Sequence, residues 1–301
     1  VEKTFVPDDP MKTYGLFLGG IDQLHPEEWR TFYAEAGERG GQRFEPDPRR
    51  IIFLDIHAMQ ARAHMARHGT SVEAIAAVAS KNHNQGRLNA RAQHRFGLTP
   101  AQVLEDRPII DPLTRAMCAP ISDGAAAVLV CSAERLATLD PALQARAIRV
   151  RGTVLVGGAY RELNAPSVAA HAGAAAYRES GLRPEDVDLA EVHDATAFCE
   201  LHAYEALGFC PEGEGGAYAL SGATQADGAR PVNLSGGLIA KGHPLAASGL
   251  GMLQELVAQL RGEADDHQAP RRPRIALQQN AGGSVGFDEA LCSVVLLERA
   301  D

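Results

Sequence analysis

The chain has 301 residues, a formal net charge of −9 and a pI near 5.7, so it lacks the basic face that a nucleic-acid partner requires. Its 45% hydrophobic and 22% charged residues are typical of a globular protein. The longest apolar runs, such as residues 124–130, are too short to cross a bilayer, and the chain has no leader-like start. We therefore expect a cytoplasmic protein with no membrane span and no nucleic-acid ligand.

The first 48 residues are polar and rich in glycine and proline, with weak periodicity and Trp29 as the main apolar anchor. Apolar residues then recur at helical spacing from Ile52 to Ala66, and Gly69 follows where such a helix would end. This pattern predicts a helix after residue 50.

Two further helix starts follow along the chain. Thr70 and Glu73 predict a capping box for a helix that ends at about Ser80. Thr99 and Pro100 predict another start, because proline is well tolerated at the first helical position.

Strands and helices alternate in the rest of the chain. The expected strands are a short buried one at 125–131 and others at 147–156, 189–192, 232–234, 274–278 and 291–297. The expected helices are at 167–180, 198–207 and 248–261. This alternation indicates an α/β fold with a mainly parallel sheet and helices on both faces. In such sheets the chemistry lies beyond the carboxyl ends of the strands.

The chain has five cysteines, an odd number, and none forms a CxxC pair. This pattern predicts neither a disulfide framework nor a zinc site, so we expect no bound metal. A reducing compartment fits free thiols best.

A glycine-rich loop carries the first candidate site residue, His243. Gly236 and Gly237 allow close approach of a ligand to the backbone, and Pro244 stiffens the turn after the histidine. A histidine held in this way can act as a general base near neutral pH. The alternative is a histidine that only hydrogen-bonds a tight turn.

Two more loops follow predicted strands. His193 could donate a hydrogen bond, directly or through water, to a developing oxyanion, or His193 and Asp194 could simply cap the helix that follows them. Beyond Asn280, Gly282 and Gly283 could form an anion-binding concavity or an ordinary turn. A base, a donor and a glycine nest on three strand ends together favour acyl transfer.

The chain resembles a thiolase in the order of four segments. These are residues 121–127, the His193 loop, the His243 loop and the Asn280 loop. The segments 81–83, 204–208 and 213–216 are similar to the sterol-carrier-protein-x type of thiolase, and the similarity spans essentially the whole chain. The resemblance implies a layered αβαβα thiolase fold with two βαβαβαββ lobes, of which the first is incomplete. Residues 1–144 would be the remainder of the first lobe, with an inserted loop region at about 4–122, and residues 145–301 the second lobe.

The resemblance also implies catalytic roles. In the family, a cysteine at the start of a first-lobe helix attacks the thioester, and it lies upstream of the segment that matches residues 1–3. We therefore expect that this chain lacks the nucleophile and is inactive alone. The family assigns His243 as the base towards that cysteine, His193 to the first oxyanion hole and the Gly282 amide to the second.

A second cysteine of the family, which exchanges the proton of carbon–carbon chemistry, is also missing. Ala195 and Asn280 stand at its two alternative positions, and neither side chain can surrender a proton at neutral pH. We expect slow Claisen chemistry even in a longer protein.

The resemblance implies that coenzyme A or an acyl-CoA binds as substrate, with no cofactor held permanently. We assign its binding to Gly236, Gly237, Ser248 and His83. For residues 81–83, a solvated helix end is an equally good interpretation.

Three functions remain open at this point. The leading one is an acyl-CoA acyltransferase that acts on 3-oxoacyl-CoA or acetyl-CoA in lipid or sterol metabolism, as a homodimer. The second is a retro-aldolase for a hydroxyacyl-CoA that works with an OB-fold partner protein. The third is a non-catalytic subunit that stabilises a partner. In each case we expect the strand at 125–131 to have few neighbours and to expose apolar surface, which favours self-association.

Overall fold

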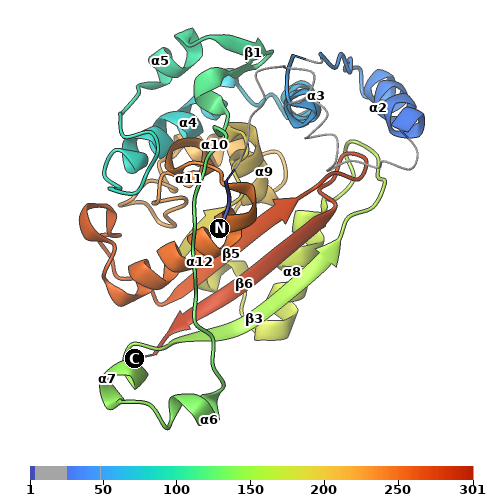
Figure 1. Ribbon diagram of the computed structural model, residues 1–301. Helices are drawn as coiled ribbons and strands as arrows, with labels where there is room; N and C mark the ends of the chain where they lie inside the picture. The colour runs from blue at the N-terminus through green and yellow to red at the C-terminus, as the bar shows by residue number, and fades with distance from the viewer. Residues whose placement is uncertain (4–25, 48, 301) are drawn as a thin grey trace.

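The computed structural model describes residues 1–3, 26–47 and 49–300 (Figure 1). Most of the inserted loop region predicted at about 4–122 is described, but residues 4–25 lie outside the described part. No helix within the described part is long and apolar enough to span a membrane.

A four-stranded sheet forms the lower half of the molecule in Figure 1. Its strands are ordered β3 (Ile148–Gly157), β6 (Leu291–Arg299), β5 (Ile275–Gly282) and β4 (Leu189–Val192). Only β4 and β5 run parallel, so the prediction of a mainly parallel sheet is wrong for these strands. The reason is the direct turn between β5 and β6, because strands joined by a short turn run antiparallel.

Helices cover both faces of this sheet, as predicted. Helix α8 (Val168–Ser180) packs on one face and α12 (Leu245–Arg261) on the other. Alternate residues of β5 point to opposite faces, so Ile275 joins the apolar cluster of α8 while Ala276 joins the cluster that contains Leu256 of α12.

A second layer of helices lies above the sheet in Figure 1, with α4 at its centre. Its helices are α2 (Pro26–Arg39), α3 (Ile52–His68), α4 (Val72–Gly86), α5 (Pro100–Glu105), α9 (Ala197–Ala206), α10 (Gly215–Leu220) and α11 (Gly237–Lys241). Helix α4 contacts α5, α9, α10 and α11. The remaining short elements are β1 (Pro108–Ile110), β2 (Leu113–Thr114), η1 (Arg115–Met117), α6 (Ala133–Leu136), α7 (Pro141–Gln144), η2 (Pro184–Asp186) and η3 (Asp265–His267).

Several predicted helix signals are confirmed. Gly69 ends α3 in the left-handed region at φ 72°, and Gly181 ends α8 in the same way at φ 71°. Thr99 and Gln102 form the capping box of α5.

The predicted start and end of α4 are wrong. Ser71, not Thr70, caps the helix by accepting a hydrogen bond from the amide of Ala74. The hydroxyl of Thr70 instead lies 2.9 Å from Nδ1 of His64. The helix continues beyond Ser80 because its next turn is buried.

Helix α2 was not predicted, although Trp29 does serve as an apolar anchor. Trp29 and Tyr33 form one side of this helix and are buried in a small separate cluster with Met59 and Phe287. The cluster joins the start of the chain to the turn before β6, a long-range contact that local periodicity does not show.

Residues 125–131 do not form the predicted buried strand. They run as an extended segment towards α6 and α7 in Figure 1, and Leu129 and Val130 are 104% and 81% exposed. A strand needs a neighbour for its backbone groups, and within the described residues the nearest bridge, between Glu2 and Gly124, lies just before this segment. The predicted exposed apolar surface is therefore present. Residues 232–234 do not form the predicted strand either. They make a single β-bridge, between Ala190 and Val232.

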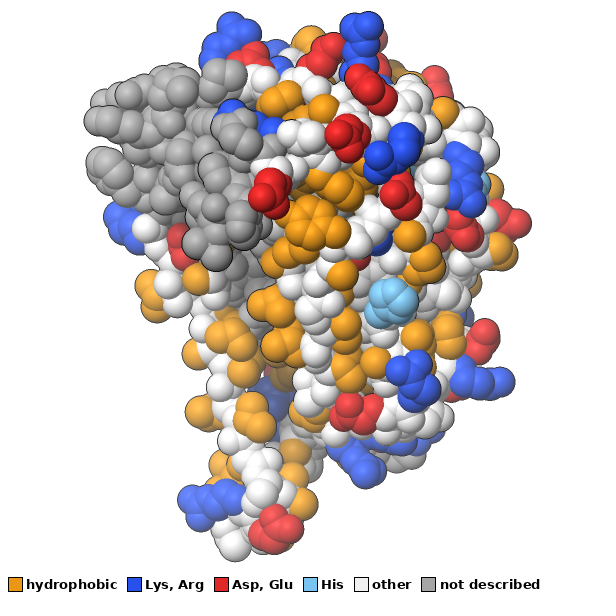
Figure 2. All heavy atoms as spheres, turned by 90° about the vertical axis from the view of Figure 1, so that its right-hand side faces the viewer, with side chains coloured by type: hydrophobic (Ala, Val, Ile, Leu, Met, Phe, Trp, Pro, Cys, Tyr) orange, Lys and Arg blue, Asp and Glu red, His pale blue; other side chains and the backbone are white. Residues whose placement is uncertain are grey.

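The edge strand β3 adds to the exposed apolar surface. Val150 and Leu155 are 47% and 68% exposed on it. Figure 2 shows the side of the molecule that lies on the right in Figure 1. Hydrophobic side chains gather on its lower half, above the projecting α6 and α7.

Candidate functional site

The structure brings the two candidate histidines together. His193 directly follows β4, and His243 follows α11. Their rings meet edge to face, with centroids 5.0 Å apart and an angle of 84° between the ring planes. Two loops that are 50 residues apart in sequence therefore share one site.

The ring of His243 is held by the first turn of α12. Its Nδ1 lies 2.8 Å from the hydroxyl of Ser248, which donates its single proton to the carbonyl of Pro244 at 2.9 Å. Ser248 must then accept from Nδ1–H, which leaves Nε2 of His243 as the basic nitrogen. Burial lowers the pKa of His243 to about 3, so the ring is neutral near pH 7. Ser248, predicted to bind coenzyme A, is thus a hydrogen-bond partner of the base.

The ring of His193 is held by β5. Its backbone amide donates to the side-chain oxygen of Gln279 at 3.0 Å, and its Nδ1 lies 3.0 Å from Oδ1 of Asn280. An amide oxygen only accepts, so Nδ1 carries the proton. Burial lowers the pKa of His193 to about 4. In the neutral ring, Nε2 therefore carries no proton.

Asp194 does not cap the helix that follows it, which corrects the prediction. Its carboxylate accepts hydrogen bonds from the amides of Leu238 (2.6 Å) and Ile239 (3.3 Å) at the start of α11. Gly237 allows this contact, because it has φ 61° and a Cβ there would collide with the carboxylate. Asp194 therefore joins the His193 loop to the His243 loop.

Gly236 and Gly237 are both buried beneath α4 and Asp194. A Cβ at Gly236 would lie 2.6 Å from the backbone of Gly86. The close backbone approach that we expected of these glycines is therefore made to α4 and Asp194. Neither glycine lines the open groove beside His243 that is described below.

The interpretation of residues 81–83 as a solvated helix end is wrong, because all three residues are buried at 3%, 0% and 3% exposure. Nζ of Lys81 lies 2.5 Å from Glu200. Nδ2 of Asn82 donates both to Glu200 at 2.6 Å and to Asp194 at 2.8 Å. This network fixes the His193 loop to α4.

His83 belongs to the same buried turn. Its Nε2 lies 3.0 Å from the carbonyl of Ala116, and its ring stacks on Phe96 with centroids 5.3 Å apart. It is not among the residues that line the groove beside His243.

That groove has a volume of about 830 Å³ and lies between residues 121–127 and the helices α11 and α12. Ser248 and the neighbours of His243, Gly242 and Pro244, line it. So do Arg91 and Lys241, which the motifs did not indicate. The two cations come from segments far apart in sequence, so only the fold places them together. A groove of this size is in the range of small-molecule sites.

Asn280 and Gly282 lie near the end of β5. Gly282 is exposed, and a Cβ built on it would meet no atom within 4 Å. The open space leaves room for a ligand group beside this strand end, two residues beyond the partner of His193.

Four of the five cysteines are at least partly buried thiols. Burial raises the pKa values of Cys118, Cys199, Cys210 and Cys292 to about 12. A nucleophilic cysteine needs the opposite shift, because the thiolate is the reactive form.

Comparison with known proteins agrees with this geometry. Residues 159–295 match the thiolase C-terminal domain-like family. Acetyl-CoA acetyltransferase from Methanothermobacter thermautotrophicus is 40% identical over 78% of this chain and 62% of its own length. Sterol carrier protein 2 from Oryctolagus cuniculus is 39% identical over 77% of this chain and 45% of its own length.

Solved structures show the same fold. The Ltp2-ChsH2(DUF35) aldolase matches with a TM-score of 0.68 and 22% identity, over 81% of this chain and 63% of the other. Human mitochondrial 3-ketoacyl-CoA thiolase matches with a TM-score of 0.54 and 19% identity, over 81% and 59%. The chain thus spans about half to two thirds of the length of these proteins. It belongs to the thiolase superfamily and resembles its sterol carrier protein 2 branch.

Proposed function

We propose that the protein is part of a thiolase-like acyltransferase that acts on 3-oxoacyl-CoA or acetyl-CoA in lipid or sterol metabolism. The observation that carries this proposal is the pair of imidazoles, His193 and His243, 5.0 Å apart beside an open groove. The relatives named acetyl-CoA acetyltransferase and sterol carrier protein 2 support the reaction class.

In this proposal each site residue acts on a thioester. Nε2 of His243 takes the proton of an attacking thiol, since the neutral ring is a base and Nδ1 is held by Ser248. The amide of Gly282 donates to the carbonyl oxygen as it becomes negative. His193 acts through a water, because its Nε2 accepts a hydrogen bond from the water and the water donates its other proton to the same oxygen. The exposed Arg91 in the groove suits the phosphates of coenzyme A, which binds as a substrate, whereas Nζ of Lys241 is buried 3.5 Å from Glu191.

We further propose that the chain alone is inactive, because none of its buried thiols has the low pKa of a nucleophile. A reducing cytoplasm would suit its five free cysteines. A homodimer would cover the exposed apolar residues, such as Leu129.

Two measurements test this proposal. Calorimetric titration of the chain with coenzyme A should show binding that weakens when Arg91 is replaced by Met. Protein expressed from the complete reading frame should form an acyl-enzyme with acetoacetyl-CoA, and His243→Gln should abolish it. His171→Gln, on the exposed side of α8, is the matched control. Acyl-enzyme formation by the His243→Gln variant at the wild-type rate would contradict the proposal.

A second candidate is retro-aldol cleavage of a hydroxyacyl-CoA, with an OB-fold partner protein. Ala195 and Asn280 favour it, because neither can supply the proton that Claisen cleavage requires. The structural neighbour named as an aldolase has the same fold. Incubation of the complete protein with a hydroxyacyl-CoA alone, compared with 3-oxoacyl-CoA plus coenzyme A, distinguishes the two reactions.

A further inference from the structure

The loop that carries His243 lies between two helices and belongs to neither. Helix α11 ends at Lys241 and α12 begins at Leu245. Gly242 has φ 105°, which breaks the helical path just before the histidine. The ring is tied to Ser248, but one hydrogen bond to a ring nitrogen leaves the rest of the ring free to pivot about it. A base whose Nε2 points in one direction therefore needs a second anchor.

Ser122 supplies this second anchor. The backbone amide of His243 donates a hydrogen bond to Oγ of Ser122 at 2.9 Å. Beside this contact, Ile121 and His243 form a parallel β-bridge. Ser122 is only 8% exposed, so water competes little for its hydroxyl. A segment 121 residues earlier in the chain thus sets where the backbone of the base lies.

Gln93 fixes the direction of the Ser122 hydroxyl. The hydroxyl donates its single proton to Oε1 of Gln93, so the lone pairs of Oγ remain for the amide of His243. The amide of Gln93 in turn donates to the carbonyl of Lys241 at 3.1 Å. The end of α11, Gln93, Ser122 and His243 therefore form a closed ring of hydrogen bonds around Gly242.

The space around Gly242 shows how closely these groups pack. A Cβ built on Gly242 would lie 2.7 Å from Oγ of Ser122 and 2.8 Å from Oε1 of Gln93, closer than such atoms can approach. Any larger residue would push Ser122 away from the amide of His243. Glycine at this position is thus required by the anchor as well as by the positive φ.

We propose that Ser122 is a positioning residue for the base. It holds the backbone of His243 while Ser248 holds Nδ1, and the two anchors together aim Nε2 at the attacking thiol. Ser122 acts through His243 and not on the substrate, because its proton is already donated to Gln93. The proposal rests on the proposed function and adds to it the residue that orients the base.

Loss of this anchor should slow proton transfer without weakening the binding of coenzyme A. Ser122→Ala removes the acceptor of the His243 amide, and a displacement of about 1 Å at a catalytic group can lower a rate about 10²-fold. We expect a fall of this size in acyl-enzyme formation. Gln93→Leu leaves the hydroxyl in place, where it can turn to the carbonyl of Pro120 at 3.2 Å, so its effect should be smaller.

The first test is the histidine side-chain nitrogen spectrum of the 301-residue chain, with His243→Gln used to assign the signal. The wild type should show the Nδ1–H tautomer of His243, whose proton is donated to Ser248. In Ser122→Ala the ring can turn, so we expect a mixture of both tautomers.

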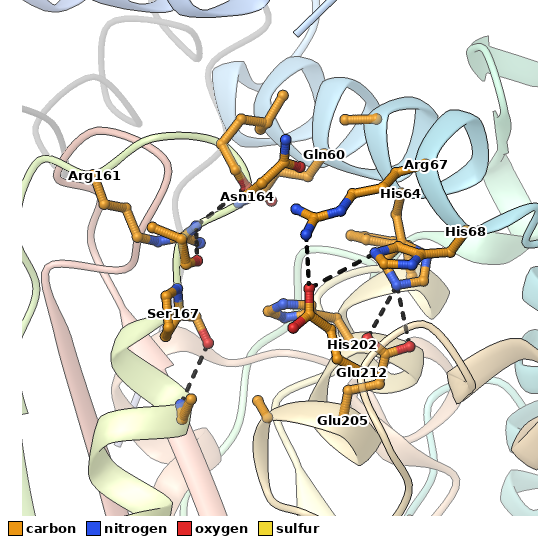
Figure 3. Close-up of a pocket in the computed structure, with 17 residues that line it drawn as sticks. Gln60, His64, Arg67, His68, Arg161, Asn164, Ser167, His202, Glu205 and Glu212 are labelled. Carbon is orange, nitrogen blue, oxygen red and sulfur yellow. Dashed lines mark hydrogen bonds and ion pairs between the residues drawn. The ribbon is translucent and has the colours of Figure 1, made fainter.

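His64 serves as the internal reference in this spectrum. Its Nε2 lies 3.1 Å from Glu205, in a separate pocket of about 160 Å³ between α3, α9 and the segment before α8 (Figure 3). Because this pocket does not include Ser122 or His243, the signal of His64 should stay the same in Ser122→Ala.

The second test is the rate of acyl-enzyme formation with acetoacetyl-CoA by protein from the complete reading frame, with the Kd for coenzyme A measured by calorimetry. Ser122→Ala should lower the rate and leave the Kd unchanged. Ser180→Ala is the matched control, because Ser180 is 7% exposed and also accepts from a backbone amide, that of Leu182 at 3.2 Å, but lies on α8. It should lower the unfolding temperature about as much and change neither the tautomer of His243 nor the rate.

The outcomes separate the two proposals. A Ser122→Ala variant that keeps the wild-type tautomer and rate would overturn the positioning role alone. If that variant does not fold, Gln93→Leu decides in the same way, because Gln93 is exposed. A wild-type protein that forms no acyl-enzyme would overturn the proposed function, while the tautomers of His243 would still show whether Ser122 holds the ring.

Discussion

Nδ2 of Asn82 donates a hydrogen bond of 2.8 Å to Oδ2 of Asp194. Because Asp194 also accepts from the first amides of α11, a residue near the C-terminal end of α4 sets the positions of both histidine loops. The catalytic geometry therefore depends on a buried polar network as much as on the histidines themselves.

Replacing Asn82 by Ala should destabilise the protein by about 3 kcal/mol. The change removes two hydrogen bonds to buried carboxylates, each worth about 1.5–3 kcal/mol. Chemical denaturation monitored by circular dichroism measures the difference. Asn84→Ala, at an exposed position in the same helix, should cost less than half as much. Equal effects of the two variants would show that the network is not important for stability.

The buried ion pair between Lys81 and Glu200 predicts a non-additive effect. Lys81→Met alone should cost about 3–5 kcal/mol, because it leaves a buried carboxylate without its cation. The double variant Lys81→Met with Glu200→Gln should recover part of this loss. A double-mutant cycle of unfolding free energies tests the prediction, and strict additivity would contradict it.

Acid should destabilise the protein partly through His243. Its pKa in the folded state is lowered to about 3, so below pH about 6.5 the unfolded state binds a proton that the folded state does not. Stability is therefore lost as the pH falls from 6.5 towards 3, by at most about 1.4 kcal/mol per pH unit. The unfolding free energy of His243→Gln should fall less between pH 7 and pH 5 than that of the wild type. His171→Gln should behave as the wild type does.

Self-association should depend on the exposed segment before α6. Replacing both Leu129 and Val130 by Lys should lower the light scattering of the purified chain, because it removes two of the most exposed apolar side chains. The same substitution at Leu220, which is 58% exposed on α10, controls for added charge. A monomeric wild-type chain would refute the prediction.

Ala195→Cys should raise the rate of carbon–carbon cleavage in protein from the complete reading frame. Ala195 follows the His193–Asp194 pair, and a positioned acid typically contributes about 10²–10⁴-fold. Thiolysis of acetoacetyl-CoA measures the effect, with Ala195→Ser as the control that adds a hydroxyl of much higher pKa. An unchanged rate would indicate that another group already supplies the proton.

Local sequence patterns predicted the helices and strands of the C-terminal half well. Gly69 and Gly181 end helices where expected, since glycine accepts the left-handed conformation at no steric cost. The α2 helix escaped prediction because its buried side, from Trp29 to Tyr33, packs on residues distant in sequence.

The amino-acid sequence by itself determined the α/β class and the two histidine loops, because glycines, prolines and strand ends act through local backbone geometry. The superfamily came from the resemblance of its motifs to a thiolase. Only the tertiary structure decided the partners of Asp194, the burial of Lys81 and Asn82, and the contact of Ser122 with the amide of His243. Whether a polar side chain caps its own helix, a distant helix or a substrate depends on which segments pack around it. Residues at least 44 positions apart meet in these contacts, and local sequence spacing carries no record of such distances.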